Sequence, residues 1–157
     1  MPESMIAMLT QRAKYALRAC IHLADRFEDA TTVQIGEIAA SENIPAKFLE
    51  AILLDMRKAG LLQSQRGRHG GYRLARPPEN LSVGDIIRVI DGTLAPIRCA
   101  SRLKFEPCED CEDAATCVIR WAMLKARDAM ATVLDRCTLA EASRRRRSLS
   151  HPLDFVI

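Results

Sequence analysis

The stretch that decides the fold is PAKFLEAILLDMRKAGLLQSQRGRHGGYRLAR, residues 45–76. Its first half has apolar side chains at helical spacing, so we expect a helix that buries one face and stops near Gly60. That face comprises Phe48, Leu49, Ile52, Leu53 and Met56. The second half predicts two short strands, LLQSQ and YRLAR, joined by the glycine-rich tip RGRHGG. A helix followed directly by a small β-ribbon is therefore the centre of the fold.

Helical patterns lie on both sides of this stretch. Residues 9–27 carry one apolar stripe, and residues 34–40 predict a short second helix. Ser82 and Asp85 resemble a capping box at the start of VGDIIRVIDG, which predicts a further helix that ends at Gly92. The order helix, helix, turn, helix and ribbon is that of a winged helix-turn-helix, whose helix after the turn enters the DNA major groove. We assign residues 1–95 to this DNA-binding domain.

The rest of the chain has a different organisation. Residues 96–117 show no periodicity and are rich in cysteine and charge, so we expect a functional loop that binds a cluster. Residues 118–140 predict a long helix with a broad apolar face that would pair with a second copy of the chain. We expect residues 141–157 to be a basic, weakly ordered tail. The predicted fold class is mainly α with a small β-ribbon: a winged helix-turn-helix domain plus a long C-terminal dimerisation helix.

Composition is that of one soluble globular unit of 157 residues, with 48% hydrophobic and 27% charged residues. The stretch MPESMIAML has Glu3 where a secretory signal needs basic residues, and no apolar run is long enough to cross a bilayer. We therefore expect a cytoplasmic protein without a membrane partner. In that reducing compartment, six cysteines indicate metal or redox chemistry rather than disulfides.

Charge is divided between two segments. Residues 57–76 contain six basic and no acidic residues, whereas residues 106–113 contain five acidic and no basic residues. The first segment suits an anionic partner and the second tolerates a cation.

Four polar side chains are candidates for DNA contact. Lys47 and Glu50 point away from the buried face of their helix, where Glu50 could accept from a cytosine amino group and Lys47 could meet guanine or phosphate. Arg66 and Arg68, at the ribbon tip, could reach the DNA backbone or a minor groove. Each charge taken alone is as well explained by a solvated surface. The coincidence of the basic segment with the ribbon tip favours DNA.

Cys99, Cys108, Cys111 and Cys117 follow the spacing C-x8-C-x2-C-x5-C. Four thiolates suit a [2Fe-2S] cluster, a [4Fe-4S] cluster or a tetrahedral zinc ion, and spacing alone does not choose between them. Neighbouring carboxylates would raise the pKa of free thiols, whereas a bound cation reverses that preference. The acids thus favour a metal over a reactive thiolate.

Two other cysteines lie outside this group. Cys20 and Cys137 fall on predicted helix faces, so we interpret both as small buried apolar residues.

Several motifs together resemble one family. LTQRAKYAL, IPAKFL, AGLL, RGRHGGYRLA and DIIRVIDG are similar to the IscR/NsrR/RirA family of bacterial iron–sulfur transcription regulators, over about residues 8–137. The resemblance implies a dimeric repressor or activator whose DNA affinity responds to a bound cluster. It also implies that Thr10 and Tyr15 lie near DNA phosphates. Cluster-binding members carry three cysteines in this region, the last two separated by five residues, as are Cys111 and Cys117.

The chain departs from the family pattern at the fourth ligand. The interval after Cys99 is longer than the family's commonest form, and Cys108 is additional. The positions that complete the site in some members correspond here to Lys14 and Arg120, which cannot ligate iron while protonated. We therefore expect Cys108 to complete an all-cysteine site for a [2Fe-2S] cluster, with [4Fe-4S] or zinc as alternatives.

The expected function is a transcription regulator whose operator binding is controlled by an iron–sulfur cluster that senses iron or cluster status, redox state or nitric oxide. We expect a homodimer on a pseudo-palindromic double-stranded operator. No hydrolase triad, P-loop or dinucleotide motif is present, so we do not expect an enzyme. One alternative is a zinc-stabilised or clusterless winged-helix repressor. A thiol–disulfide redox protein that uses Cys108 and Cys111 is less favoured. Redox C-x-x-C motifs lie at the start of a helix, whereas this one lies within an acidic loop.

Overall fold

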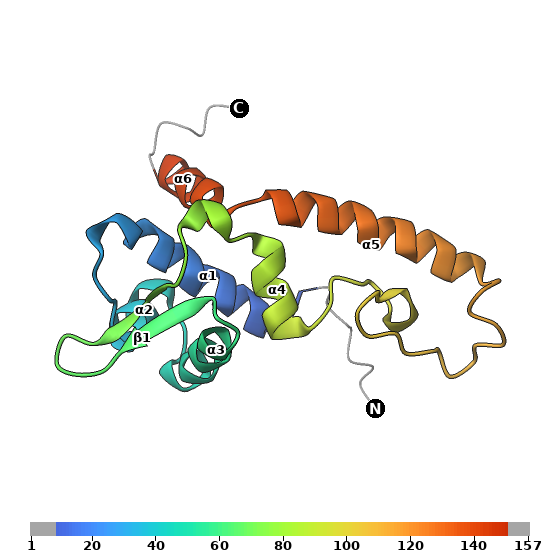
Figure 1. Cartoon of the computed structure of the whole chain (residues 1–157), viewed down its shortest axis with the longest axis horizontal. Coiled ribbons are helices and arrows are strands. Elements are labelled where there is room, and N and C mark those ends of the chain that lie inside the picture. The colour runs from blue at the N-terminus through green and yellow to red at the C-terminus, as the bar shows by residue number, and fades with distance from the viewer. Residues whose placement is uncertain (1–8, 151–157) are drawn as a thin grey trace.

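The computed structural model describes residues 9–150 and confirms a mainly helical fold with one small β-ribbon. In Figure 1 the first four helices and the ribbon form one mass, and the long fifth helix projects from it above an extended loop. The helices and strands are α1 (Gln11–Asp25), α2 (Ile35–Glu42), α3 (Ala46–Lys58), β1 (Leu62–Gln65), β2 (Gly71–Leu74), α4 (Val83–Asp91), α5 (Val118–Arg136) and α6 (Leu139–Leu149). Three short 3-10 turns lie between them: η1 (Phe27–Asp29), η2 (Pro78–Asn80) and η3 (Arg98–Ala100).

The main core surrounds α1, which contacts α2, α3, α4 and α6. Helix α3 contributes four large buried side chains, Leu49, Ile52, Leu53 and Met56, and it contacts α1. Fully buried side chains include Leu23, Ile38, Leu49, Ile52, Leu53, Met56, Ile86 and Leu139. One side of α3, the helix after the turn, is therefore packed in the core, and its opposite side faces solvent.

The local signals in the sequence produce the expected ends and turns. Ser82 and Asp85 form a reciprocal capping box at α4, which ends at Gly92 with φ 80°. Strands β1 and β2 pair antiparallel. A side chain at Gly71 would bring a Cβ within 2.3 Å of the Val33 carbonyl oxygen, so only glycine lets the ribbon approach this segment.

The expectation of a weakly ordered tail from residue 141 is wrong as far as residue 150. Thr138 caps α6 by accepting from the Glu141 amide at 3.1 Å. Arg146 pairs with Glu42 at 2.7 Å and with Asp25, so one of the four consecutive arginines anchors α6 to α1 and α2. Accordingly α5 ends at Arg136 rather than at residue 140. Residues 151–157 lie outside the described part of the chain.

The expectation that Phe48 is buried is also wrong, since its side chain is 60% exposed. Phe48 lies one turn before the buried Ile52, but it is at the edge of the buried row, whereas Leu49 in the same turn is fully buried. Pro45, Ala46 and Lys47 are exposed with it.

Helix α5 contacts the winged domain through its C-terminal half. Ala131 packs with Ile87 and Leu94, and Arg88 donates to both carboxylate oxygens of Asp135 at 2.7 and 2.8 Å. Of the face expected to pair with a second copy, Val118, Ile119 and Val133 are exposed in this single chain, whereas Leu134 packs against the cluster of Ile87, Leu94 and Ala131. No helix within residues 9–150 is long and apolar enough to span a membrane.

We predict that Leu139→Ala lowers the free energy of unfolding by roughly 2–5 kcal/mol, because this α6 side chain is fully buried in the main core. The matched control Leu149→Ala, on an α6 side chain that is 47% exposed, should change it by less than about 0.5 kcal/mol. Urea unfolding at one protein concentration measures both. Equal, small effects would mean that α6 is not part of the core.

Candidate metal centre and nucleic-acid interface

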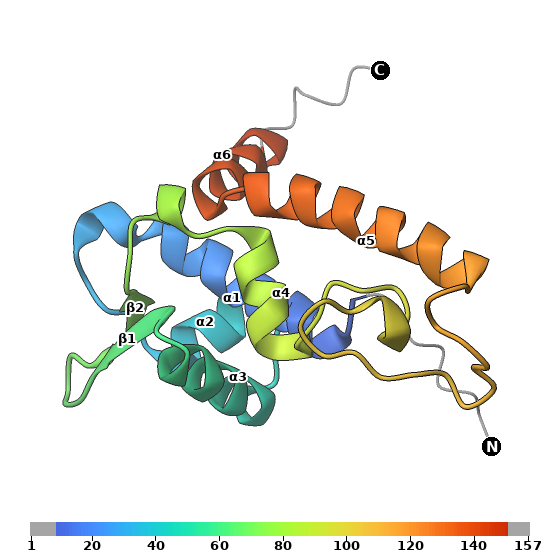
Figure 2. The same cartoon turned by 45° about the vertical axis from the view of Figure 1, so that its right-hand side comes forward.

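The four cysteines of the loop line one cavity of about 410 Å³. The cavity lies between the loop and the start of α5, at the end of the molecule opposite the ribbon (Figure 2). The other lining residues are Ile97, Asp110, Glu112, Asp113, Ala114, Thr116, Ile119 and Arg120. Folding therefore brings together thiols that span 19 residues of sequence, as the spacing suggested.

Cys99 and Cys108 are the loop thiols whose sulfur atoms are in contact. Cys99 is 3% exposed in the turn η3, whereas Cys108 is exposed, and their sulfurs lie 3.9 Å apart. Two thiolates on one tetrahedral ion, with metal–sulfur bonds of about 2.3 Å, would be about 3.8 Å apart. This pair is already spaced as two ligands of a single ion.

Cys111 and Cys117 lie at the two ends of the loop segment that leads from Cys108 to α5. The Cys111 amide donates to the Cys108 carbonyl at 3.1 Å, forming a turn, and the Cys117 sulfur caps α5 by accepting from the Arg120 amide at 3.4 Å. Both thiols are half-buried. Across residues 9–150, no three side chains of the metal-binding types are arranged to hold an ion. A four-thiolate site thus requires Cys111 and Cys117 to move toward the Cys99–Cys108 pair.

Arg120 holds the loop against α5. Its Nε donates to the Cys99 carbonyl at 2.8 Å, its Nη1 donates to the Ala114 carbonyl at 3.5 Å, and its guanidinium lies 5.4 Å from the Phe105 ring centroid. Sequence reasoning considered this position only as one that cannot ligate iron and missed its bridging role. Its place three residues after Cys117, on the first turn of α5, was the available signal.

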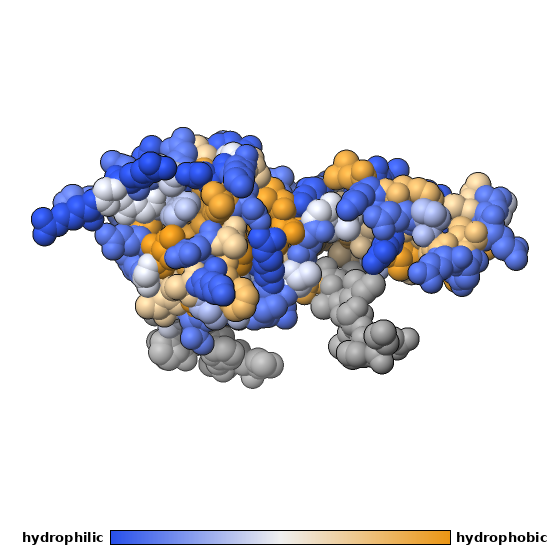
Figure 3. All heavy atoms as spheres, turned by 90° about the horizontal axis from the view of Figure 1, so that it is seen from below, coloured by the Kyte–Doolittle hydropathy of each residue, from blue (hydrophilic) through white to orange (hydrophobic). Residues whose placement is uncertain are grey.

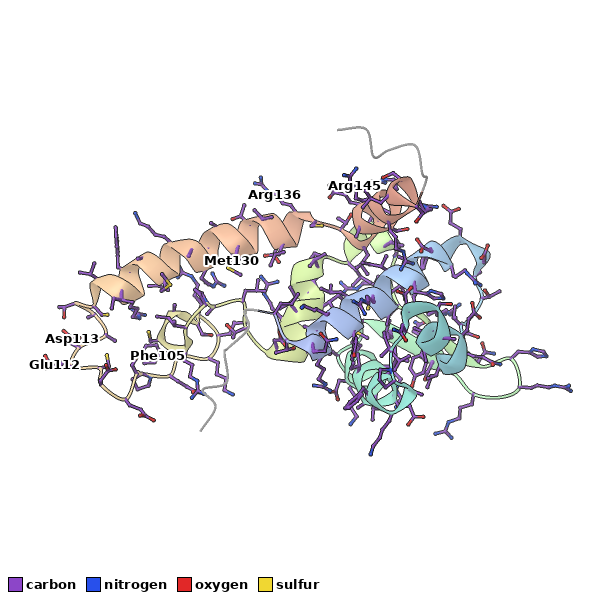
Figure 4. All side chains as sticks on the ribbon, turned by 180° about the vertical axis from the view of Figure 1, so that it is seen from behind. Phe105, Glu112, Asp113, Met130, Arg136 and Arg145 are labelled. Carbon is purple, nitrogen blue, oxygen red and sulfur yellow. The ribbon has the colours of Figure 1, made fainter. Side chains whose placement is uncertain are left out.

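The acidic residues of the loop divide into two groups. Asp110, Glu112 and Asp113 line the thiol cavity, and Figure 4 places Glu112 and Asp113 at its outer turn. Glu106 instead pairs with Arg98 at 3.4 Å, away from the cavity lining. The negative charge next to the thiols is therefore smaller than the sequence count suggests.

The pKa values and burial of the cysteines distinguish a structural thiol in the core from the thiols of the loop. Burial raises the pKa of Cys20 to about 12, and its sulfur contacts Met56 in the core, which agrees with a structural role. Burial, followed by the contact with Cys108, raises the pKa of Cys99, so a metal must displace its proton. Cys137 is half-buried rather than buried, because it lies at the C-terminal end of α5.

The candidate DNA-contacting charges are exposed as expected on α3 and on the ribbon tip. Lys47 and Glu50 lie in the first turns of α3, and Arg66 and Arg68 lie between β1 and β2. The ribbon tip is the strongly hydrophilic protrusion at the left of Figure 3. The Arg68 carbonyl accepts from the Gln34 side chain at 3.2 Å, which ties this tip to the start of α2.

Thr10 and Tyr15 have partners within the protein. Thr10 caps α1, and its hydroxyl donates to Asp91 at 2.5 Å, which ties α1 to the end of α4. Tyr15 is half-buried against the main core, with the Arg18 guanidinium 6.0 Å from its ring centroid. Contact of either residue with DNA phosphates stays a prediction.

Comparison with known proteins agrees with this architecture. A family model described as Rrf2, iron-dependent transcriptional regulator, matches residues 9–145. An Rrf2-like helix-turn-helix transcriptional regulator of Rhodobacter capsulatus is 43% identical over 136 residues, covering 85% of this chain and 91% of that protein.

Two solved structures have the same fold. The structure of T. potens IscR superposes with a TM-score of 0.73 at 29% identity and covers 96% of both chains. That of CymR, described as the global cysteine regulator of B. subtilis, gives 0.71 at 32% identity and covers 87% of this chain and 96% of that one. These matches confirm the resemblance drawn from the sequence. Because the relatives are transcriptional regulators, they also confirm that the chain is not an enzyme.

We predict a marked contrast in alkylation between Cys108 and Cys20 in metal-free protein at pH 8. Cys20 should carry on the order of 10³-fold less thiolate than an ordinary cysteine, because its pKa is raised to about 12 and its side chain is buried. Peptide mass spectrometry after brief iodoacetamide treatment should find Cys108 modified and Cys20 intact. Modification of Cys20 at the rate of Cys108 in folded protein would contradict the packing described above.

Proposed function

The chain belongs to the Rrf2 family of transcriptional regulators, and we propose that it binds its operator as a homodimer whose DNA affinity is set by an iron–sulfur cluster. The observation that carries this proposal is the single cavity lined by Cys99, Cys108, Cys111 and Cys117 at the start of α5. The description of the family model as iron-dependent supports the choice of iron.

The donor set fits a [2Fe-2S] cluster held by thiolates alone. Such clusters take four cysteine ligands, and hydrogen bonds to their sulfurs adjust the reduction potential. The Arg120 amide already donates to the Cys117 sulfur. When bound, the cluster would supply a charge and a set of bonds that respond to iron supply, oxidation or nitric oxide. The same four thiolates could also hold a [4Fe-4S] cluster.

Control of DNA binding follows from the position of the site in the chain. Cys117 begins α5, so its movement toward the Cys99–Cys108 pair pulls the first turn of α5 against the loop. The same turn exposes Val118, Ile119 and Trp121, which we assign to the contact with the second copy. Ligation of the thiols thereby biases how two winged domains are held relative to each other.

The winged domain would read the operator through α3 and the ribbon. With its row of buried residues facing α1, α3 turns its charged first turns outward, as insertion in a major groove requires. Arg66 and Arg68 at the tip would hold flanking phosphates or a minor groove. Two copies related by a twofold axis would recognise a pseudo-palindromic site.

A zinc-stabilised or clusterless regulator is the second candidate. Its clusterless form is favoured by the absence, within residues 9–150, of three side chains gathered around one point, and by the likeness to the cysteine regulator CymR. A zinc form would be colourless, whereas an anaerobically purified cluster form absorbs visible light. A thiol–disulfide enzyme has least support, since Cys108 contacts Cys99 and not its motif partner Cys111 through sulfur.

We predict that Cys117→Ala abolishes the visible absorbance of anaerobically purified protein, because it removes one of the four ligands. Cys137→Ala is the matched control, and it should keep full colour since Cys137 lies outside the cavity lining. Iron and sulfide counted per chain must follow the absorbance. Full colour in Cys117→Ala, or its loss in Cys137→Ala, would refute the ligand assignment.

We predict that Arg66→Ala weakens DNA binding and reduces the slope of log affinity against log salt by about 1, because one phosphate contact is lost. Arg145→Ala is the charge-matched control, since α6 lies on the opposite side of the domain from α3 (Figure 1). Anisotropy titrations at several salt concentrations measure both slopes. An unchanged slope for Arg66→Ala would remove Arg66 from the interface.

A further inference from the structure

Phe48 is an exposed aromatic side chain on the helix that we expect to meet DNA. It is 60% exposed in the first turn of α3, beside the exposed Pro45, Ala46 and Lys47. Ala51, one turn further on, is also exposed. The outward end of α3 therefore presents apolar groups among its charged residues.

The core does not require this ring. Leu49, Ile52, Leu53 and Met56 are all fully buried and complete the contact of α3 with α1. The exposed apolar residues of α5 do not lie near it either, because α3 and α5 are on different sides of the molecule in Figures 1 and 2. Pairing through α5 would leave Phe48 uncovered.

Along the whole of α3, exposed basic residues outnumber unpaired acidic ones, which favours an anionic partner. Of the two acidic residues on α3, Asp55 is paired with Arg12, which leaves Glu50. The same helix carries Lys47, Arg57 and Lys58, and all three are exposed. A partner that suits this surface combines phosphate charge with a small apolar group.

We propose that Phe48 is a specificity residue that packs against the 5-methyl group of a thymine in the DNA major groove. The inference rests on the proposed function, in which α3 enters that groove. The thymine methyl is the apolar group displayed on base edges there, and phenylalanine is among the side chains that contact it. Duplex RNA does not fit, because its deep, narrow major groove excludes side chains and uracil lacks the methyl.

The assignment extends the set of specificity residues beyond Lys47 and Glu50. Those two side chains offer hydrogen bonds that suit guanine and cytosine, whereas Phe48 adds discrimination for thymine at a neighbouring position. Removal of one methyl contact should weaken binding about three- to tenfold.

The experiment begins with selection of the full-length wild-type chain on a random duplex DNA pool. Thymines in the recovered consensus are then replaced one position at a time by uracil, and the dissociation constant is measured by anisotropy for wild type, Phe48→Ala, Phe48→Gln and Leu149→Ala. We expect one uracil position in each half-site to weaken wild type and Leu149→Ala about three- to tenfold. Neither Phe48 variant should distinguish uracil from thymine at that position.

The outcomes separate the two claims. If wild type recovers no consensus, DNA reading by α3 is wrong, and the thymine contact falls with it. If a consensus emerges but uracil is tolerated at every position, or if the Phe48 variants keep the uracil penalty, only the thymine contact is wrong. A fall in thermal midpoint or in dimer content in both Phe48 variants, with the uracil penalty retained, would show that the ring covers a protein surface instead.

Discussion

The sulfur of Cys117 has two roles in the structure. It caps α5 by accepting the Arg120 amide, and it lines the cavity shared with the other loop thiols. Because this atom joins the metal site to the helix that we assign to dimerisation, a change of ligation alters the start of α5 directly.

Three arginine contacts connect α5 to the loop and to α4. Arg120 binds the loop at Cys99, Arg102 in the loop pairs with Asp128, and Arg88 on α4 pairs with Asp135. The pKa of Asp128 is lowered to about 2 by its hydrogen bonds from Arg102 and then from Arg127. Since the folded pKa lies below the ordinary aspartate value of 3.8, the stabilising effect is present above that value and is lost as pH falls through about 2. These pairs therefore stay charged at neutral pH and connect the loop, α4 and α5 as one unit.

Periodicity and capping patterns were sufficient for the elements of the winged domain, because their causes are local. The capping box at Ser82, the positive φ at Gly92 and the buried row of α3 all follow from residues within a few positions of each other. The spacing of the loop thiols likewise indicated that they lie near one another, and they line one cavity, although no three of them are arranged to hold an ion within residues 9–150.

The features that the sequence did not predict depend on contacts between distant parts of the chain. Helix α6 is held by Arg146, whose partner Asp25 lies 121 residues earlier, and no local pattern distinguishes this arginine from its three neighbours. Phe48 has the spacing of a core residue, but its exposure depends on which face of α3 the neighbouring helices cover. The bridging role of Arg120 depends on the path of a loop that has no periodicity.

Amide hydrogen exchange at the start of α5 tests the central claim most directly. The peptide that covers residues 117–124 should be compared in anaerobic cluster-loaded protein and in the same preparation after chelation, with α3 as an internal reference. The account predicts slower exchange at this turn in the loaded protein and no change in the buried part of α3. Equal exchange at the start of α5 in the two states would contradict control through Cys117.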